Sequence, residues 1–145
     1  MNVEALQSEL FQKIGAFRPG GLRLIVFDRI LDAARHSNVV YAYELADQVS
    51  YFGETSGSAV SRNAKLASDT RCKIDSGLPL NGAAWRLLEA IEQQRTVSVW
   101  TGPALLDMTR TRRRELEQDF MRRFDTIDNP HEREHPYRWN NYRLR

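Results

Sequence analysis

The chain of 145 residues contains a single cysteine, Cys72. One cysteine excludes a disulfide framework within the chain and a zinc cluster built from cysteines. No apolar run approaches the length of a membrane span. The amino terminus, Met1 to Glu4, lacks a basic region followed by an apolar core, so no signal peptide is expected. Together these absences favour a cytoplasmic protein.

Lysine is also scarce. Only Lys13, Lys65 and Lys73 are lysines, so 18 of the 21 basic residues are arginine. The planar fork of arginine matches phosphate oxygens bidentately, which a lysine ammonium does not. Residues 110–145 contain ten arginines and seven acidic residues, a net charge of +3, whereas residues 1–109 carry a net charge of −1. This basic region is either a solvated helix face or a surface that binds nucleic acid phosphates.

The three histidines do not form a metal-binding pattern. His131 and His135 are four residues apart, but Pro130 and Pro136 bracket them in a predicted loop. The sequence also lacks motif support for Ser/His/Asp or Cys/His nucleophiles. With 41% hydrophobic and 28% charged residues, the chain is predicted to be one ordinary globular domain.

Two strand-like runs in the middle of the chain predict a β-hairpin. They extend from Asn38 to Leu45 and from Gln48 to Glu54, and the short link Ala46-Asp47 predicts a tight reversal. Because side chains alternate between the faces of a strand, Tyr41 and Tyr43 share one face, as do Tyr51 and Gly53. The other predicted elements are helices over 3–17, 58–68, 82–94 and 111–124, a strand over 96–100 and a polar loop over 69–77. The segment 22–34 is ambiguous: residues 22–27 fit a strand, but the spacing of Phe27, Ile30, Leu31 and Ala34 favours a helix, which is the prediction.

Several short motifs follow one another in a defined order. Val39-Val40-Tyr41 and Tyr51-Phe52-Gly53 lie on the two strands of the hairpin, and Arg62 lies on the next predicted helix. Glu117 is followed at +3 and +4 by two apolar residues. A proline-to-asparagine ending follows, from Pro136 to Asn140. This ordered set resembles the GIY-YIG nuclease family, and the resemblance covers residues 38–141.

Three departures from the family pattern stand out. Val39 replaces the leading glycine of the first tripeptide, which a strand tolerates. Where the family carries His, Tyr or Lys one turn after the arginine, this chain has Leu66, with Lys65 one residue short. An apparent insertion covers Thr126 to His135.

The resemblance implies an α+β fold with a small three-stranded antiparallel sheet flanked by helices. Residues 1–37 would form an amino-terminal helical extension packed on the core, and residues 38–145 the nuclease-like domain.

The resemblance also implies a metal-dependent DNA endonuclease. Glu117 would hold one Mg²⁺, with Mn²⁺ as a substitute, and Arg62 would bond the non-bridging phosphate oxygens. Tyr41 would act as general base; free tyrosine has a pKa near ~10, so it needs a nearby cation. Tyr51 would position the water or a phosphate oxygen, and Lys65 would fill the position after the arginine. Asn140 would orient the glutamate or fix the carboxyl-terminal segment.

DNA is the predicted partner. The residues predicted to contact it are Arg110, Arg112, Arg113, Arg114 and Arg122. One cutting centre nicks one strand, so cleavage of both strands requires a homodimer or two successive events. Two alternatives remain open from the sequence: a DNA- or protein-binding module on a degenerate nuclease scaffold, and a small interaction domain whose resemblance to the family is accidental.

Overall fold

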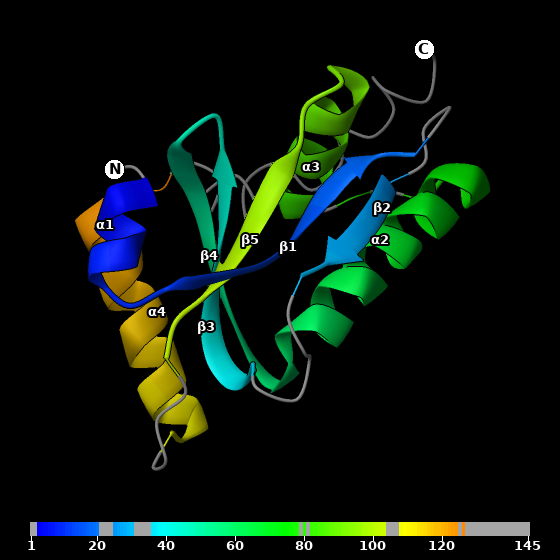
Figure 1. Cartoon of the computed structure of the whole chain (residues 1–145). Helices are drawn as coiled ribbons and strands as arrows, with labels where there is room; N and C mark the ends of the chain where they lie inside the picture. Colours follow the sequence, from blue (N-terminus) through cyan, green and yellow to red (C-terminus); the bar gives the residue numbers. More distant parts are fainter. Residues whose placement is uncertain are drawn as a thin grey trace.

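The computed structural model describes residues 3–20, 25–30, 36–78, 80, 82–103, 108–124 and 126. These residues form five strands and four helices: α1 (Val3–Ser8), β1 (Gln12–Pro19), β2 (Ile25–Arg29), β3 (Ser37–Leu45), β4 (Gln48–Ser58), α2 (Ala59–Ser76), α3 (Gly82–Glu92), β5 (Val97–Thr101) and α4 (Arg110–Phe124). The strands form one sheet in the order β2-β1-β5-β3-β4, and every neighbouring pair is antiparallel. Helices α2 and α3 lie on one side of the sheet, and α1 and α4 lie on the other (Figure 1).

The predicted hairpin is confirmed as β3 and β4. Leu45 pairs with Gln48 across the two-residue turn. Ala46 and Asp47 both have positive φ, 50° and 66°. Two positive φ angles in a two-residue loop give the turn geometry that matches the twist of antiparallel strands. The Asp47 N–H donates to the Glu44 carboxylate over 2.9 Å, which holds the turn.

Side chains that alternate along the strands divide the core into two clusters. Tyr41, Tyr43 and Tyr51 belong to the cluster beneath α2 and α3. Val40 and Phe52 belong to the cluster beneath α1 and α4. The hairpin therefore contributes to both faces of the sheet.

The sheet differs from the prediction because it has five strands rather than three. The predicted helix over 3–17 ends at Ser8, and residues 12–19 form β1 between β2 and β5. Within the predicted helix over 22–34, residues 25–29 form β2. Ile14 and Phe17 fit helical spacing, but pairing on both sides of β1 satisfies its backbone groups in the extended form. The first 37 residues thus supply two strands of the same sheet as the rest.

Helix α2 is longer than predicted. It begins after Ser58, whose hydroxyl accepts the Ser61 N–H over 3.2 Å, and it continues through the predicted loop over 69–77 as far as Ser76. Gly77, with φ 71°, ends the helix in a left-handed cap. The predictions for α3, β5 and α4 are confirmed to within two residues at each end. In the described part of the chain, no helix has the length and apolar character needed to cross a membrane.

Candidate active site

Three tyrosine rings pack together on the α2 side of the hairpin. Tyr43 pairs with Tyr51 across the two strands, and their rings stack with centroids 4.9 Å apart and planes 21° apart. The Tyr41 ring lies 5.7 Å from that of Tyr43 and 6.3 Å from that of Tyr51. All three side chains are buried. The cluster therefore fixes the orientation of each phenol ring.

The absence of a side chain at Gly53 leaves the space that the Tyr41 ring occupies. The two residues are paired across β3 and β4. A Cβ added at Gly53 would lie 2.5 Å from the Tyr41 hydroxyl oxygen and 2.8 Å from its Cε2 atom, both too close for a real contact. The phenol thus lies directly over the glycine, and any larger residue would displace it. The last residue of the Tyr51-Phe52-Gly53 tripeptide is explained by this close approach.

Arg62 approaches the tyrosines from α2. Its guanidinium donates a hydrogen bond to the Tyr41 hydroxyl. The pKa of Arg62 is raised, first by this hydrogen bond and then by the attraction of a charged Tyr41; burial opposes the shift, while Tyr43 and Tyr51 add to it. The Arg62 guanidinium is therefore bonded to Tyr41 and lies within electrostatic range of Tyr43 and Tyr51. Arg62 as a whole is exposed to solvent. A cation beside a phenol hydroxyl stabilises the phenolate.

Asn63, the residue after Arg62, ties the helix to the tyrosines. The Tyr43 hydroxyl donates to its Oδ1 over 2.5 Å, and its Nδ2 donates to the Ala59 carbonyl over 2.8 Å. Asn63 is fully buried. Sequence reasoning missed this residue, and an asparagine inside a polar helix gave no signal. The position of Tyr43 could be predicted, because it lies two residues after Tyr41 on the predicted strand and so shares its face.

Lys65 is paired on the exposed surface of α2. Its ammonium pairs with Asp69 one turn further along α2 over 3.1 Å, and its side chain is 70% exposed. Leu66 is partly buried against the core on the tyrosine side of the sheet. Lys65 thus has an acidic partner on the helix surface, and its role after Arg62 stays a prediction.

Glu117 lies on the other side of the sheet from α2. Helix α4 packs on β3 and β4 with Phe120 and Phe124 in the second core cluster. Glu117 is partly buried, which fits its place on the stripe of α4 that faces the sheet. Strand β4 is the edge of the sheet, so Tyr51 on this strand faces α2, and the helix that carries Glu117 packs against the opposite face of the strand.

The described residues around Glu117 fit a metal site with a single protein carboxylate rather than one with several protein ligands. Among the described residues, no group of three or more His, Cys, Asp and Glu side chains could hold an ion. A single partly buried carboxylate suits Mg²⁺, which keeps several waters and often takes one protein carboxylate together with phosphate oxygens. It does not suit zinc, which takes three or four protein ligands. Asn140, His131 and His135 lie outside the described residues.

The arginines of α4 fall into two groups. Arg110, Arg112, Arg114 and Arg122 are exposed. Arg113 is 6% exposed, and its guanidinium donates to Glu54 over 2.7 Å and to Asn38. The prediction that Arg113 contacts DNA therefore does not fit its burial, since its charge is already paired inside the protein. The spacing of Arg113 from Phe120 and Phe124, seven and eleven residues, is the signal that places it on the buried stripe.

The fold is one found among DNA endonucleases. Bacteriophage T4 EndoII, solved as a mutant, superposes with a TM-score of 0.62 at 17% sequence identity, covering 87% of this chain and 96% of EndoII. The restriction endonuclease HPY188I, solved in complex with product DNA, gives a TM-score of 0.52 at 11% identity, covering 87% of this chain and 83% of that enzyme. No family model and no curated protein sequence matches the chain.

Proposed function

We propose that this protein is a metal-dependent DNA endonuclease that cuts phosphodiester bonds by a GIY-YIG-type mechanism. The observation that carries the proposal is the hydrogen bond between Arg62 and Tyr41, with the Tyr41 ring lying over Gly53. It joins a potential base and a phosphate-binding cation in one fixed arrangement. The fold shared with two endonucleases supports the same conclusion.

Tyr41 and Arg62 have distinct roles in the proposed reaction. A water oxygen forms a new bond to phosphorus, its proton passes to the Tyr41 phenolate, and the bond from phosphorus to the leaving oxygen breaks. Arg62 stabilises Tyr41 as the phenolate before the attack. It then donates to the non-bridging oxygens as they gain negative charge, an interaction worth ~3–4 kcal/mol when the donor is preorganised. Tyr51, stacked on Tyr43, borders the site and positions the water or a phosphate oxygen.

The chain's other residues would support this chemistry from both sides of the edge strand. Glu117 would hold Mg²⁺, or Mn²⁺ in its place, and the ion would supply charge stabilisation for the leaving oxygen. Asn63 fixes α2 against Tyr43, so the start of the helix, including Arg62, keeps its place over the hairpin.

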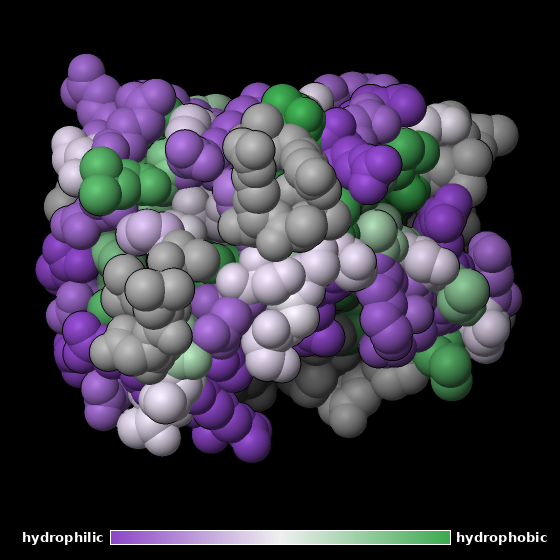
Figure 2. Space-filling model, turned by 60° about the horizontal axis from the view of Figure 1, so that its bottom comes forward, coloured by the Kyte–Doolittle hydropathy of each residue, from purple (hydrophilic) through white to green (hydrophobic). Residues whose placement is uncertain are grey.

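A cationic end of the molecule could bind the DNA backbone. The first turn of α2 is held at the start of β3, where the Ala59 N–H donates to the His36 carbonyl over 2.8 Å. The first turn of α4 is held there too, through contacts of Asn38. The exposed arginines Arg62, Arg110, Arg112 and Arg114 therefore lie at the same end of the sheet. Figure 2 turns this end forward and shows hydrophilic side chains over much of it.

The proposal is tested with supercoiled plasmid. The protein is incubated with plasmid and Mg²⁺, with Mn²⁺, and with a chelator, and nicked and linear products are separated on a gel. We expect nicking with either ion and none with chelator. Linear product that grows with protein concentration, out of step with nicked product, would indicate cleavage by a homodimer. Intact plasmid under all conditions, with a folded protein, would contradict the proposal.

One observation favours a second function, a DNA-binding module that does not cut. Of the two residues near the family's position after the arginine, Lys65 pairs with Asp69 on the helix surface, and Leu66 is apolar and packs against the core cluster that contains the tyrosines. Such a module would retard a DNA fragment in a gel with an affinity that falls as salt rises, yet leave plasmid intact in Mg²⁺. The endonuclease proposal predicts both retardation and nicking.

A further inference from the structure

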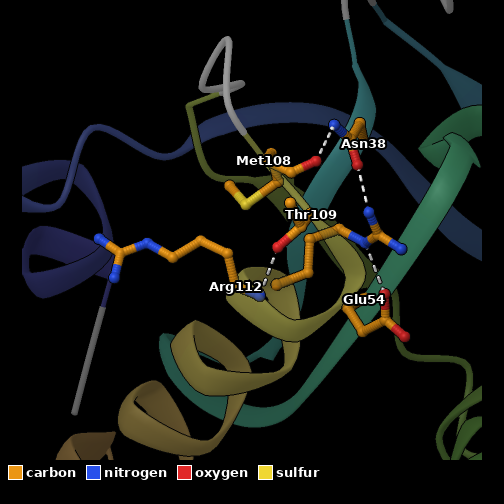
Figure 3. A network of polar contacts seen from close by, with 6 residues as sticks. Asn38, Glu54, Met108, Thr109 and Arg112 are labelled. Atoms are coloured by element: carbon orange, nitrogen blue, oxygen red, sulfur yellow. Dashed lines mark hydrogen bonds and ion pairs between the residues drawn. The ribbon is translucent and has the colours of Figure 1, made fainter.

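A buried polar network joins α4 to the edge of the sheet. Arg113 Nε donates to Glu54 Oε2 over 2.7 Å, and its Nη1 donates to the Asn38 side-chain oxygen. The Asn38 side-chain nitrogen in turn donates to the Met108 carbonyl over 2.9 Å, just before α4 begins. The side chains of Arg113 and Glu54 are 7% and 19% exposed. Figure 3 shows Asn38 and Glu54 converging on this junction, while the Arg112 side chain points away from it.

Such a network contributes little to the free energy of unfolding, because the cost of taking the two charges out of water offsets most of their attraction. Replacing a buried ion pair by apolar residues is often neutral or stabilising, whereas removing one partner costs ~3–5 kcal/mol. What the pair supplies is geometry, because the planar guanidinium binds Glu54 and Asn38 in fixed directions. The rotation of α4 about its axis is thereby tied to β3 and β4.

Strand β4 separates the two halves of the proposed site. Tyr51 and Gly53 face α2, while the alternating residues Phe52 and Glu54 face α4. Phe120 of α4 stacks on Phe52 with ring centroids 5.4 Å apart and planes 18° apart. Helix α4 thus contacts two residues of β4: Arg113 bonds Glu54, and Phe120 and Phe124 pack on Phe52.

Glu117 lies between these two contacts on the same stripe of α4. It follows Arg113 by four residues and precedes Phe120 by three, and residues with these spacings are neighbours on a helix surface. We propose that the Glu54–Arg113 ion pair positions Glu117 at the β4 edge so that its carboxylate can hold the metal ion. Glu54 and Arg113 are positioning residues in this account, which rests on the proposed function.

The test separates positioning from stability. In the variant that combines Glu54→Gln with Arg113→Met, both charges are lost, so neither is left buried and unpaired, and we expect a melting temperature near that of the unmodified protein. Mn²⁺ binding is measured from the electron paramagnetic resonance signal of free Mn²⁺, with a nuclease-resistant phosphorothioate duplex bound. We expect the double variant to bind Mn²⁺ ~10–100-fold more weakly, the usual loss when a residue that orients a metal ligand is removed. Glu115→Gln, which removes an exposed carboxylate from the same helix, is the matched control and should bind Mn²⁺ normally.

A folded double variant with normal Mn²⁺ affinity would overturn the inference, because Glu117 would then not depend on the pair. If the double variant does not unfold cooperatively, Glu54→Asp and Arg113→Lys keep both charges while altering their reach. Weaker Mn²⁺ binding in these variants supports positioning, and normal binding in both overturns it. Glu117→Ala distinguishes failure of the proposed function: if it binds Mn²⁺ normally, Glu117 is not a ligand at all.

Discussion

Replacing Gly53 by alanine is the sharpest perturbation of the tyrosine cluster. The added Cβ would lie 2.5 Å from the Tyr41 hydroxyl oxygen, so the ring must move. The Tyr43 and Tyr51 rings confine that movement, with centroids 5.7 Å and 6.3 Å from that of Tyr41. Overpacking of this kind costs ~1–3 kcal/mol, and at ~2–4 °C per kcal/mol for a chain of this size the melting temperature should fall by roughly 3–10 °C. Moving the hydroxyl also breaks its bond to Arg62, so plasmid nicking at saturating DNA should slow by ~100-fold.

Gly57 supplies the matched control on the same strand. A Cβ at Gly57 would meet nothing within 4 Å. Gly57→Ala should therefore leave nicking unchanged, and by restricting the unfolded chain it should raise stability by ~0.4–1 kcal/mol. Equal melting temperatures and equal nicking rates for the two alanine variants would refute the account of why a glycine lies opposite Tyr41.

The remaining predictions concern other parts of the site. Tyr41→Phe should keep the melting temperature near normal, because the ring is retained, and should lower the cleavage rate by several orders of magnitude; a normal rate would remove Tyr41 from the chemistry. The cleavage rate of the unmodified protein should rise with pH above neutrality, by up to ~10-fold per unit, as a phenol base loses its proton. The pKa of Arg62 is raised, so its contribution to stability is fully present below its unfolded pKa and is lost only at higher pH; melting temperatures between pH 7 and 9 should not reflect its titration. Asn63→Ala should destabilise the protein by ~1–3 kcal/mol, since the Tyr43 hydroxyl loses its acceptor in the core, and chemical denaturation measures this. Replacing Arg112 and Arg114 by alanine should flatten the plot of log DNA affinity against log salt by up to ~1 unit per lost phosphate contact, whereas Arg113→Met should leave that slope unchanged and lower stability.

The parts of the fold that the sequence predicts are those with strong local patterns. The hairpin, α3, β5 and α4 each carry a clear period of apolar residues, and the structure places them within two residues of the predicted bounds, except that β4 continues four residues past Glu54 to Ser58. Strand β1 was missed because Ile14 and Phe17 have the spacing of a helix face. The interactions that make it a strand are distant in sequence, such as the pairing of Phe17 with Val97. No local pattern signals a partner eighty residues away.

The structure brings some of the predicted site residues together and buries one of the predicted DNA contacts. The ordered motifs led to Tyr41, Tyr51 and Arg62, and the structure brings these three together. Charge alone could not separate Arg113 from its exposed neighbours, because its burial depends on how α4 packs against β4. The role of Asn63 could not be predicted for the same reason, because its partner Tyr43 lies on β3 and Asn63 lies on α2. Both cases show that the assignment of polar residues requires knowledge of which helix face meets the sheet.

The central claim is that Tyr41 and Arg62 act together in cutting DNA. The most direct measurement is a double-mutant cycle on the single-turnover cleavage rate of plasmid in Mg²⁺, with Tyr41→Phe, Arg62→Met and the two combined. If the pair acts as one unit, each single change should slow cleavage by at least ~100-fold, and the combined change should be little slower than either. Normal rates in both single variants, with intact folding, would contradict the claim.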